Sequence, residues 1–278
     1  MRRQKKYSLH RLLIILLGLI LSIGWIYPFF IIFIGSLKTR SEIFTDPISL
    51  PDNPVWGNYA TAWENMDYGT SFMNSLIITV VSVFLIVIFS AMAAYALSRV
   101  SSRISRLIYL SCAVLMLVPF QTLMIPLVTL FGQIDLINRV GLIIMNVGFG
   151  LNLSIFLYYG ALQSVPVSMD EAAKLDGASK FRTFWDIIFP SLRSTTATVI
   201  ILNAIRIWND YLLPSLVINQ DGMRTIPLQM YAFFGEYTVQ WELALAALVL
   251  SIIPIIILYI FLQRYIVQGV TDGAVKAS

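Results

Sequence analysis

The chain has 278 residues, of which 58% are hydrophobic and 12% are charged, and its mean hydropathy is +0.79. Soluble domains have about 45–50% apolar and about 25% charged residues, so this composition excludes an ordinary soluble domain and indicates an integral membrane protein. The net charge of +4 is spread along the borders of apolar runs, a distribution typical of membrane topology and not of nucleic-acid binding.

Six apolar segments predict an all-α polytopic membrane protein. A bilayer core about 30 Å thick requires about 20 apolar helical residues. Five uncharged runs are long enough, and a sixth is interrupted only by Arg206 and Asp210. The expected spans lie at about residues 12–36, 71–98, 107–131, 141–164, 192–216 and 243–264. They form one domain over residues 12–265, between a basic tail at 1–11 and a C-terminal tail at 266–278.

Lysines and arginines near the span ends predict that both termini are cytoplasmic. Most basic residues fall in the tails and in the segments after the second and fourth spans, and cytoplasmic segments are enriched in such residues. The first span is too long for a secretory signal and no small-residue cleavage site follows it, so we expect an uncleaved anchor. The segment 38–67 is then outside, and its prolines favour an ordered extended loop over a helix.

The segment Ser168–Pro190, "SMDEAAKLDGASKFRTFWDIIFP", is rich in charge and is expected in the cytoplasm, between the fourth and fifth spans. Ser168 followed by Glu171 fits a capping box, in which both side chains satisfy free backbone N–H groups at a helix start. We therefore expect a short helix over 169–176. Gly177 is expected to stop this helix, because glycine readily adopts the left-handed conformation at that position.

A second short helix is predicted after Ser179, whose hydroxyl can cap the first turn. Its sequence has one apolar face at helical spacing, and Pro190 is expected to end it. The apolar face consists of Phe181, Phe184, Trp185 and Ile188, and the polar face of Lys180, Arg182, Thr183 and Asp186. The segment 168–190 therefore predicts a helix–Gly–helix bracket at the membrane surface. A simpler alternative is that the bracket only anchors the loop there.

The same segment carries a family resemblance. "EAAKLDGASKFRTFWDIIFPSL" resembles the EAA motif of ABC importer permeases, through Glu171, Ala172, Ala173, Gly177, Ile187 and Pro190. Further segments resemble the carbohydrate-uptake branch of that family, in the maltose-type second permease subunit and its multiple-sugar and glycerol-phosphate relatives. They are "NYATAWEN", "FMNSLIITV", "MLVPFQTLMIPL", "IRIWNDYLLP" and "QGVTDGAVKAS". The resemblance covers nearly the whole chain.

This resemblance implies that the bracket is a coupling helix that docks in a cleft of a separate ATPase. The residues expected to dock are Asp170, Glu171, Ala172, Ala173, Asp176 and Gly177. None of the fifteen glycines is followed by lysine, so the chain lacks the phosphate loop G-x-x-x-x-G-K-[ST]. We therefore expect no catalytic residue, no bound cofactor and no metal in this chain, with ATP and magnesium handled by the partner ATPase.

The resemblance also implies a multi-pass importer subunit in a bacterial cytoplasmic membrane. Its expected partners are a second permease subunit, a cytoplasmic ABC ATPase dimer, an extracytoplasmic solute-binding protein and a sugar. The loop at about 219–242 is a candidate contact for the binding protein, with turn chemistry at Asp221-Gly222, and it equally fits a plain connection. The tail at 269–278 resembles a segment that reaches the ATPase interface, and a solvated tail is the alternative.

Arg206 and Asp210 need an explanation, because a charge near the bilayer centre costs about 2.5–3.5 kcal/mol on insertion scales. They are four residues apart, so they can form an ion pair on one helix face. That pair can be self-satisfied, or it can belong to a polar face on the transport pathway or the partner subunit. The candidates for such a face are Asn203, Arg206, Asn209 and Asp210. Other polar residues within the spans, Gln121, Asn146 and Asn152, equally fit hydrogen bonds between helices.

Three other functions compete with a sugar importer. A self-contained secondary carrier commonly has inverted repeats and paired broken helices, and only one span is interrupted here. An ABC permease for a solute other than a sugar would carry the same EAA segment, so only the carbohydrate-type segments count against it. A structural membrane subunit would leave the bracket at 168–190 without a role.

Overall fold

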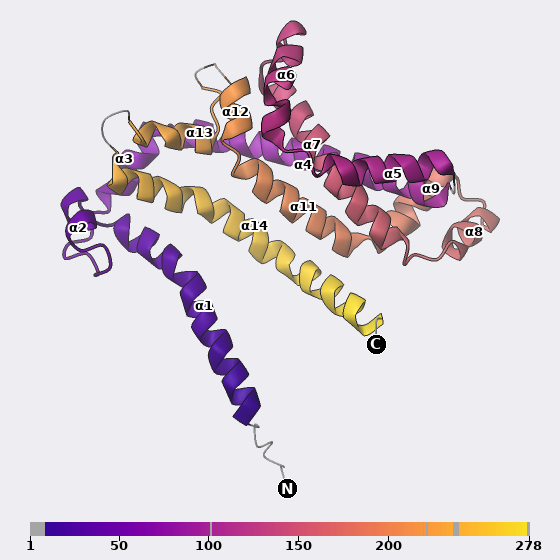
Figure 1. The fold of residues 1–278 in the computed structure, drawn as a ribbon, viewed down its shortest axis with the longest axis horizontal. Helices are drawn as coiled ribbons and strands as arrows, with labels where there is room; N and C mark the ends of the chain where they lie inside the picture. Colours follow the sequence, from indigo (N-terminus) through magenta and orange to yellow (C-terminus); the bar gives the residue numbers. More distant parts are fainter. Residues whose placement is uncertain (1–8, 101, 219, 221, 236–238, 277–278) are drawn as a thin grey trace. The chain divides into compact units, whose positions relative to one another are not determined.

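The computed structural model describes residues 9–276 except 101, 219, 221 and 236–238. The regular secondary structure of these residues is helical, apart from one isolated bridge between Phe234 and Val239. The chain divides into two compact units: unit 1 is Met1–Met66 with Met230–Ile252, and unit 2 is Asp67–Gln229 with Ile253–Ser278. The elements (Figure 1) are α1 (Leu9–Gly35), α2 (Arg40–Thr45), α3 (Gly57–Asn65), α4 (Tyr68–Arg99), α5 (Arg103–Leu115), α6 (Phe120–Gln133), α7 (Arg139–Leu162), α8 (Ser168–Leu175), α9 (Lys180–Thr183), a π-helix (Phe184–Ile188), α10 (Phe189–Ser191), α11 (Arg193–Trp208), α12 (Leu212–Val217), α13 (Ile226–Met230), a 3₁₀ turn (Tyr231–Phe233) and α14 (Trp241–Lys276).

Four of the described helices are long and apolar enough to cross a membrane, and the number rises to six if two bent helix pairs each count as one span. The four are α1, α4, α7 and α14. This confirms a polytopic helical membrane protein. The last helix continues past the expected end of its span at 264, and its backbone stays helical as far as Lys276, so most of the expected C-terminal tail is an extension of α14.

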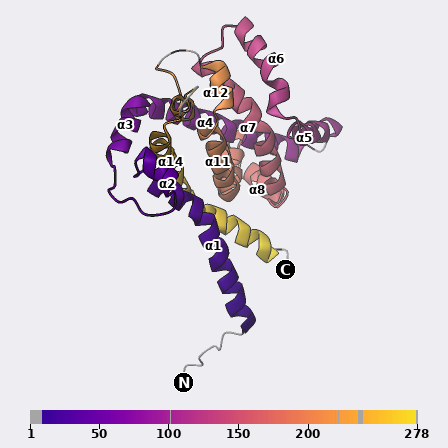
Figure 2. The ribbon, with the colours of Figure 1, turned by 60° about the vertical axis from the view of Figure 1, so that its left-hand side comes forward.

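The segment expected to form the third span is not one helix. It consists of α5 and α6, which meet at an angle of 105°. Proline lacks a backbone N–H and disfavours a helical conformation in the residue before it. Pro119 lies between the two helices, where it has extended backbone angles and stands at the N-cap of α6. Figure 2 shows α6 leaving the direction of α5 at this break.

The segment expected to form the fifth span is also divided. The helix α11 has 16 residues and ends at Trp208, and α12 begins at Leu212. The helices before and after Leu192 meet at 77°. Asn209 and Asp210 therefore lie in a break between helices, not on the continuous helix that the apolar pattern predicts.

In unit 1 the loop after α1 is ordered, as expected, but it is partly helical and not simply extended. Thr39 and Glu42 form a capping box that starts α2, with the Thr39 backbone N–H donating to the Glu42 carboxylate at 2.8 Å. This hydrogen bond lowers the pKa of the Glu42 carboxyl. All three prolines of the loop lie between α2 and α3, so they interrupt neither helix: they are Pro47, Pro51 and Pro54.

Unit 2 is built on the packing of α4 against α7 and α11, which run alongside one another in Figures 1 and 2. Lipid chains provide no hydrophobic drive between helices, so close packing of small residues and interhelical hydrogen bonds hold such helices together. Gly150 of α7 lies at the tightest approach: a Cβ there would be 2.3 Å from Ile86 Cδ1 of α4 and 2.7 Å from Asn203 Oδ1 of α11. Asn203 also donates a hydrogen bond of 3.0 Å to Ser154 of α7.

Replacing Gly150 with alanine should destabilise this three-helix core, because its methyl group overpacks a buried contact, at a typical cost of about 1–3 kcal/mol. Cys112 is the sole cysteine and is 8% exposed, so a thiol-reactive dye reports unfolding of the purified chain. We expect Gly150→Ala to lower the temperature at which Cys112 reacts. Gly148→Ala on the same helix is the control, because no atom lies within 4 Å of its Cβ position. If Gly148→Ala lowered the temperature of Cys112 reaction as much as Gly150→Ala, this packing constraint would be contradicted.

Candidate functional site

The first helix of the bracket forms where the sequence predicts it, but its N-terminus is built differently. α8 spans Ser168–Leu175, and Val167 takes the N-cap position with helical backbone angles and no side-chain cap. The expected capping box of Ser168 and Glu171 is therefore wrong. The chain enters α8 through a turn in which the backbone N–H of Asp170 donates to the Val167 carbonyl at 2.9 Å. Ser168 is already inside the first helical turn, where its hydroxyl has no capping role.

The C-terminal end of α8 confirms the role of Gly177. Its φ is +79°, in the left-handed region that glycine tolerates best. The Gly177 N–H donates to the Lys174 carbonyl at 3.1 Å, and the Ala178 N–H donates to the Ala173 carbonyl at 2.9 Å. These two bonds form a Schellman motif. The turn therefore fixes the direction in which the chain leaves α8.

The second part of the bracket has the predicted cap and a different helix type. The Ser179 hydroxyl accepts a hydrogen bond from the Arg182 N–H, which confirms the predicted cap. After α9 the chain forms a π-helix. Phe184 and Ile188 of the predicted apolar face are buried, but Thr183 of the predicted polar face is buried too, whereas Phe181 is 67% exposed. Pro190 lies within α10, which ends one residue later at Ser191.

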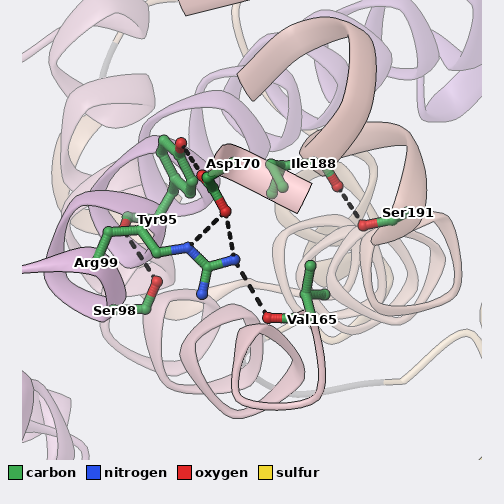
Figure 3. Close-up of polar contacts among 7 residues, drawn as sticks. All are labelled: Tyr95, Ser98, Arg99, Val165, Asp170, Ile188 and Ser191. Carbon is green, nitrogen blue, oxygen red and sulfur yellow. Dashed lines mark hydrogen bonds and ion pairs between the residues drawn. The ribbon is translucent and has the colours of Figure 1, made fainter. Parts of the chain in front are cut away.

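Asp170 faces the interior of unit 2 rather than solvent (Figure 3). Its Oδ2 forms an ion pair of 3.0 Å with Arg99 at the end of α4, and the two side chains are only 17% and 16% exposed. The Tyr95 hydroxyl donates to Asp170 Oδ1, and Arg99 Nη2 also donates to the Val165 carbonyl at 3.3 Å. The Tyr95 ring packs on Phe184 of the π-helix with ring centroids 5.3 Å apart. We call Tyr95, Arg99 and Asp170 the α4–α8 latch.

The six residues expected to dock on an ATPase thus divide between two sides of α8. Glu171, Ala172, Asp176 and Gly177 are exposed, and Leu175, beside them, is 89% exposed. The other two, Asp170 and Ala173, face inward, and Ala173 is 3% exposed. The surface available to a partner is therefore a small face of apolar and charged residues, which also includes Lys174, next to the exposed ring of Phe181.

The four polar residues expected around the fifth span also separate. Arg206 does not pair with Asp210: its guanidinium donates to the Asn146 carbonyl at 3.1 Å and to Asn146 Oδ1 at 3.4 Å. Asp210 accepts from the Leu213 N–H at 3.3 Å. The reason is that α11 ends at Trp208, so the two residues no longer share one helix face. Asn203 is buried between α11 and α7, and Asn209 donates to its own helix at Ile205.

Arg206 and Asp210 nevertheless line the same cavity, of about 480 Å³, at the break between α5 and α6. The cavity also contains aromatic rings and neutral amides. Its lining residues of these kinds are Phe120, Phe149, Gln121 and Asn152. The sequence left Gln121 and Asn152 open between a pathway surface and hydrogen bonds between helices, and it did not predict the break in the helix beside Gln121. The proline at 119 was the available signal.

A loop before α13 is bound to the start of α4. Asn74 Nδ2 donates to the carbonyls of Gly222 at 2.9 Å and Arg224 at 3.0 Å, while Arg139 donates to Asn74 Oδ1 at 2.7 Å. The φ of Gly222 is +76°, which confirms a turn there. Asp221, the other residue of the predicted turn, lies outside the described residues.

Comparisons with known proteins converge on one family. Residues 86–272 match the family described as "Binding-protein-dependent transport system inner membrane component". Over 98% of its length the chain is 49% identical to the probable starch degradation products transport system permease protein AmyC of Thermoanaerobacterium thermosulfurigenes, covering 99% of that protein. It is 32% identical, over 95% of its length and 96% of the relative, to the melibiose/raffinose/stachyose import permease protein MelC of Bacillus subtilis.

A solved structure agrees with these relatives. One chain in the crystal structure of a bacterial ABC transporter involved in the import of the acidic polysaccharide alginate matches this chain with a TM-score of 0.78 and 26% identity. The match covers 95% of this chain and 99% of that one.

Valine at position 177 should loosen the bracket through backbone strain alone. No atom lies within 4 Å of the Gly177 Cβ position, but an L-amino acid other than glycine in the left-handed backbone conformation destabilises the fold by about 1–2 kcal/mol. Hydrogen exchange of the α8 amides should therefore rise about 5- to 30-fold in Gly177→Val. Gly177→Asn should change it less, because asparagine tolerates the left-handed region, and Gly160→Val, in open space on α7, should leave α8 unchanged. If hydrogen exchange of the α8 amides were as fast in Gly177→Asn as in Gly177→Val, backbone strain at residue 177 would be ruled out as the cause.

Proposed function

This chain belongs to the family of binding-protein-dependent transport system inner membrane components, and we propose that it is the membrane-spanning permease subunit of an ATP-driven ABC importer for a sugar. The observation that carries this proposal is the rigid bracket at 168–191, whose exposed α8 face is fixed by a Schellman turn and by the α4–α8 latch. Such a preformed projection suits transmission of force between a membrane pathway and a separate motor.

The proposed topology has six spans with both termini in the cytoplasm. The pair α5 and α6 counts as the third span, and α11 together with α12 counts as the fifth. The distribution of lysine and arginine supports this orientation. It puts α8 and the Arg99 end of α4 in the cytoplasm, and it puts α2, α3 and the loop bound by Asn74 outside.

The exposed face of α8 is the proposed docking surface for the ATPase dimer. Glu171 offers charge-assisted hydrogen bonds, and Ala172 allows close approach. Leu175, which is 89% exposed in this chain, adds an apolar contact. The chain has no phosphate-binding loop of its own. We therefore assign ATP and magnesium to the partner ATPase and no catalytic step to this subunit, in a bacterial cytoplasmic membrane.

A sugar cargo is supported by the relatives and by the cavity at the α5–α6 break. The starch-product and melibiose/raffinose/stachyose permeases cover nearly the whole chain. Sugars are bound by aromatic faces together with polar side chains, and the cavity offers Phe120 and Phe149 beside Gln121, Asn152 and Arg206. We assign Arg206 and Asp210 to the pathway surface, and we assign Asn203 to holding α11 on α7. A second permease subunit would complete the pathway, and an extracytoplasmic binding protein would deliver the sugar.

The proposed function can be tested by isolating the chain with its partners. The chain is tagged at its C-terminus, extracted gently from its own membrane, and its companions are identified by mass spectrometry. Recovery of a second permease and an ATPase is expected, followed by binding-protein-dependent uptake of a labelled α-linked oligosaccharide into proteoliposomes. Recovery of the chain alone with uptake driven by an ion gradient would instead establish a secondary carrier. An assembled importer that carries only a non-sugar solute would refute the sugar assignment.

Reversing the charge at Glu171 should weaken ATPase docking while leaving the fold intact. Glu171 is exposed on α8, so Glu171→Lys should not change the thermal stability of the chain. Loss of charge-assisted hydrogen bonds costs about 1.5–3 kcal/mol, so we expect roughly a 10- to 100-fold loss of affinity for the ATPase dimer, measured by pull-down titration. Glu64→Lys on α3 makes the same charge change at an exposed position on the proposed outer side, and its affinity should equal that of the unchanged protein. Normal ATPase binding by Glu171→Lys would contradict the docking assignment.

A further inference from the structure

The helix α4 is bound by polar side chains to a different loop at each of its ends. Both loops are far from it in the sequence, with separations of 71 residues at one end and 148 at the other. One loop is the bracket that carries α8, and the other is the segment at 222–226. Helix packing does not require either connection, because the close contact of α4 with α7 at Gly150 lies away from both ends of α4.

At the proposed cytoplasmic end, the α4–α8 latch connects α4 directly to the bracket through side-chain contacts (Figure 3). The Nε and Nη2 atoms of Arg99 each lie 3.0 Å from Asp170 Oδ2. Nη2 also donates to the Val165 carbonyl, so Arg99 binds the turn before α8 as well. Tyr95 adds a hydrogen bond to Asp170 and a ring contact to Phe184. Two parts of the bracket and the turn before it are therefore bound to one turn of α4.

At the opposite end, Asn74 uses its whole amide group. Its NH₂ donates to the carbonyls of Gly222 and Arg224, and its carbonyl oxygen accepts from Arg139. Ser75 accepts from the Ile226 N–H at 2.9 Å. Asn74 and Ser75 are 4% and 3% exposed. The segment 222–226 is thus held by two successive side chains of α4.

Between its ends α4 is a continuous helix of 32 residues with no internal proline, and at about 1.5 Å per residue it is about 48 Å long. A helix of this kind moves as one body when it is packed along its length. We propose that α4 is a relay that couples the outer loop at 222–226 to α8, with Asn74 as the positioning residue at one end and Arg99 and Asp170 as the positioning residues at the other. This inference rests on the proposed transport function, because it assigns the two loops to the binding-protein side and the ATPase side.

The relay explains why Asp170 differs from the other acidic residues of the bracket. Asp176 and Asp186 are exposed, and the ion pair of Asp186 with Arg182 is 61% and 74% exposed, so solvent screens it. The Arg99–Asp170 pair is largely shielded, and removing one partner from such a pair is strongly destabilising for the geometry it fixes. Asp170→Asn should therefore release α8 from α4 while every residue of the exposed docking face keeps its identity.

The test compares the assembled, co-purified complex with Asp170→Asn or Asn74→Ala in this chain. Hydrogen exchange is measured at both loops. A relay predicts a cross-effect: Asp170→Asn should increase exchange about tenfold at 222–229 as well as in α8, and Asn74→Ala should increase it in α8 as well as at 222–229, within the usual range of coupling between sites. Asp170→Glu, which keeps the carboxylate, should restore part of the protection. Ser98→Ala is the matched control, because it removes a hydrogen bond that stays within α4, from Ser98 Oγ to the Tyr95 carbonyl.

The transport readout is the stimulation of ATP hydrolysis by sugar-loaded binding protein. We expect each variant to reduce this stimulation about tenfold with the ATPase still bound, and the double variant to be no worse than either single one, because both break the same connection. Local effects without the cross-effect would overturn the relay whether or not the complex transports sugar. Unchanged stimulation in Asp170→Asn would overturn it as well. A complex of the unchanged protein that no sugar stimulates would instead refute the proposed function, while the exchange data would still decide the connection through α4.

Discussion

The close approach of α7 to α4 and α11 at Gly150 is the contact on which the rest of unit 2 depends. In lipid, helices gain little from burying apolar surface against each other, so small residues and hydrogen bonds decide where they meet. Gly150 admits Ile86 of α4 and Asn203 of α11 at distances that no side chain there would allow, and Asn203 bonds Ser154 one turn further along α7. Because α4 is fixed along α7 in this way, its two ends are at defined positions, and the loops bound to those ends are positioned with them.

Hydropathy predicts the continuous apolar helices of this chain well and its divided apolar segments poorly. The expected segments at 12–36, 71–98 and 141–164 correspond closely to α1, α4 and α7. A hydropathy profile counts apolar residues and does not register a change in helix direction, so it merged α5 with α6 and extended α11 into α12. Pro119 marks the first break by its backbone chemistry. The second break precedes Pro214 in α12, whose ring would clash with the Asp210 carbonyl in a continuous helix, but Asn209 and Asp210 were interpreted as residues within a helix.

In the candidate site, features set by neighbouring residues were predictable and features set by distant residues were not. Gly177 and Ser179 act within a few residues of the chain, and the sequence predicted both. The predicted capping box at the start of α8 was wrong. The chain enters α8 directly from the turn at Ser164–Val167, so no side-chain cap is needed. Asp170 finds Arg99 at a separation of 71 residues, and the pattern of one sequence contains no sign of that pairing.

The two sides of α8 solve a problem that any helix of eight residues faces. Such a short helix is unstable alone, because nucleation is costly and few hydrogen bonds follow it. The inward residues, Asp170 and Ala173, supply an ion pair and a buried contact, and the Schellman turn at Gly177 fixes the other end. The exposed side, from Glu171 to Leu175, is therefore ordered before any partner arrives. A partner that binds a preformed surface loses less conformational entropy on association, and a surface tied to α4 transmits displacement as well as affinity. A docking helix held only by its flanking chain could supply the affinity, but its own bending would absorb much of the displacement.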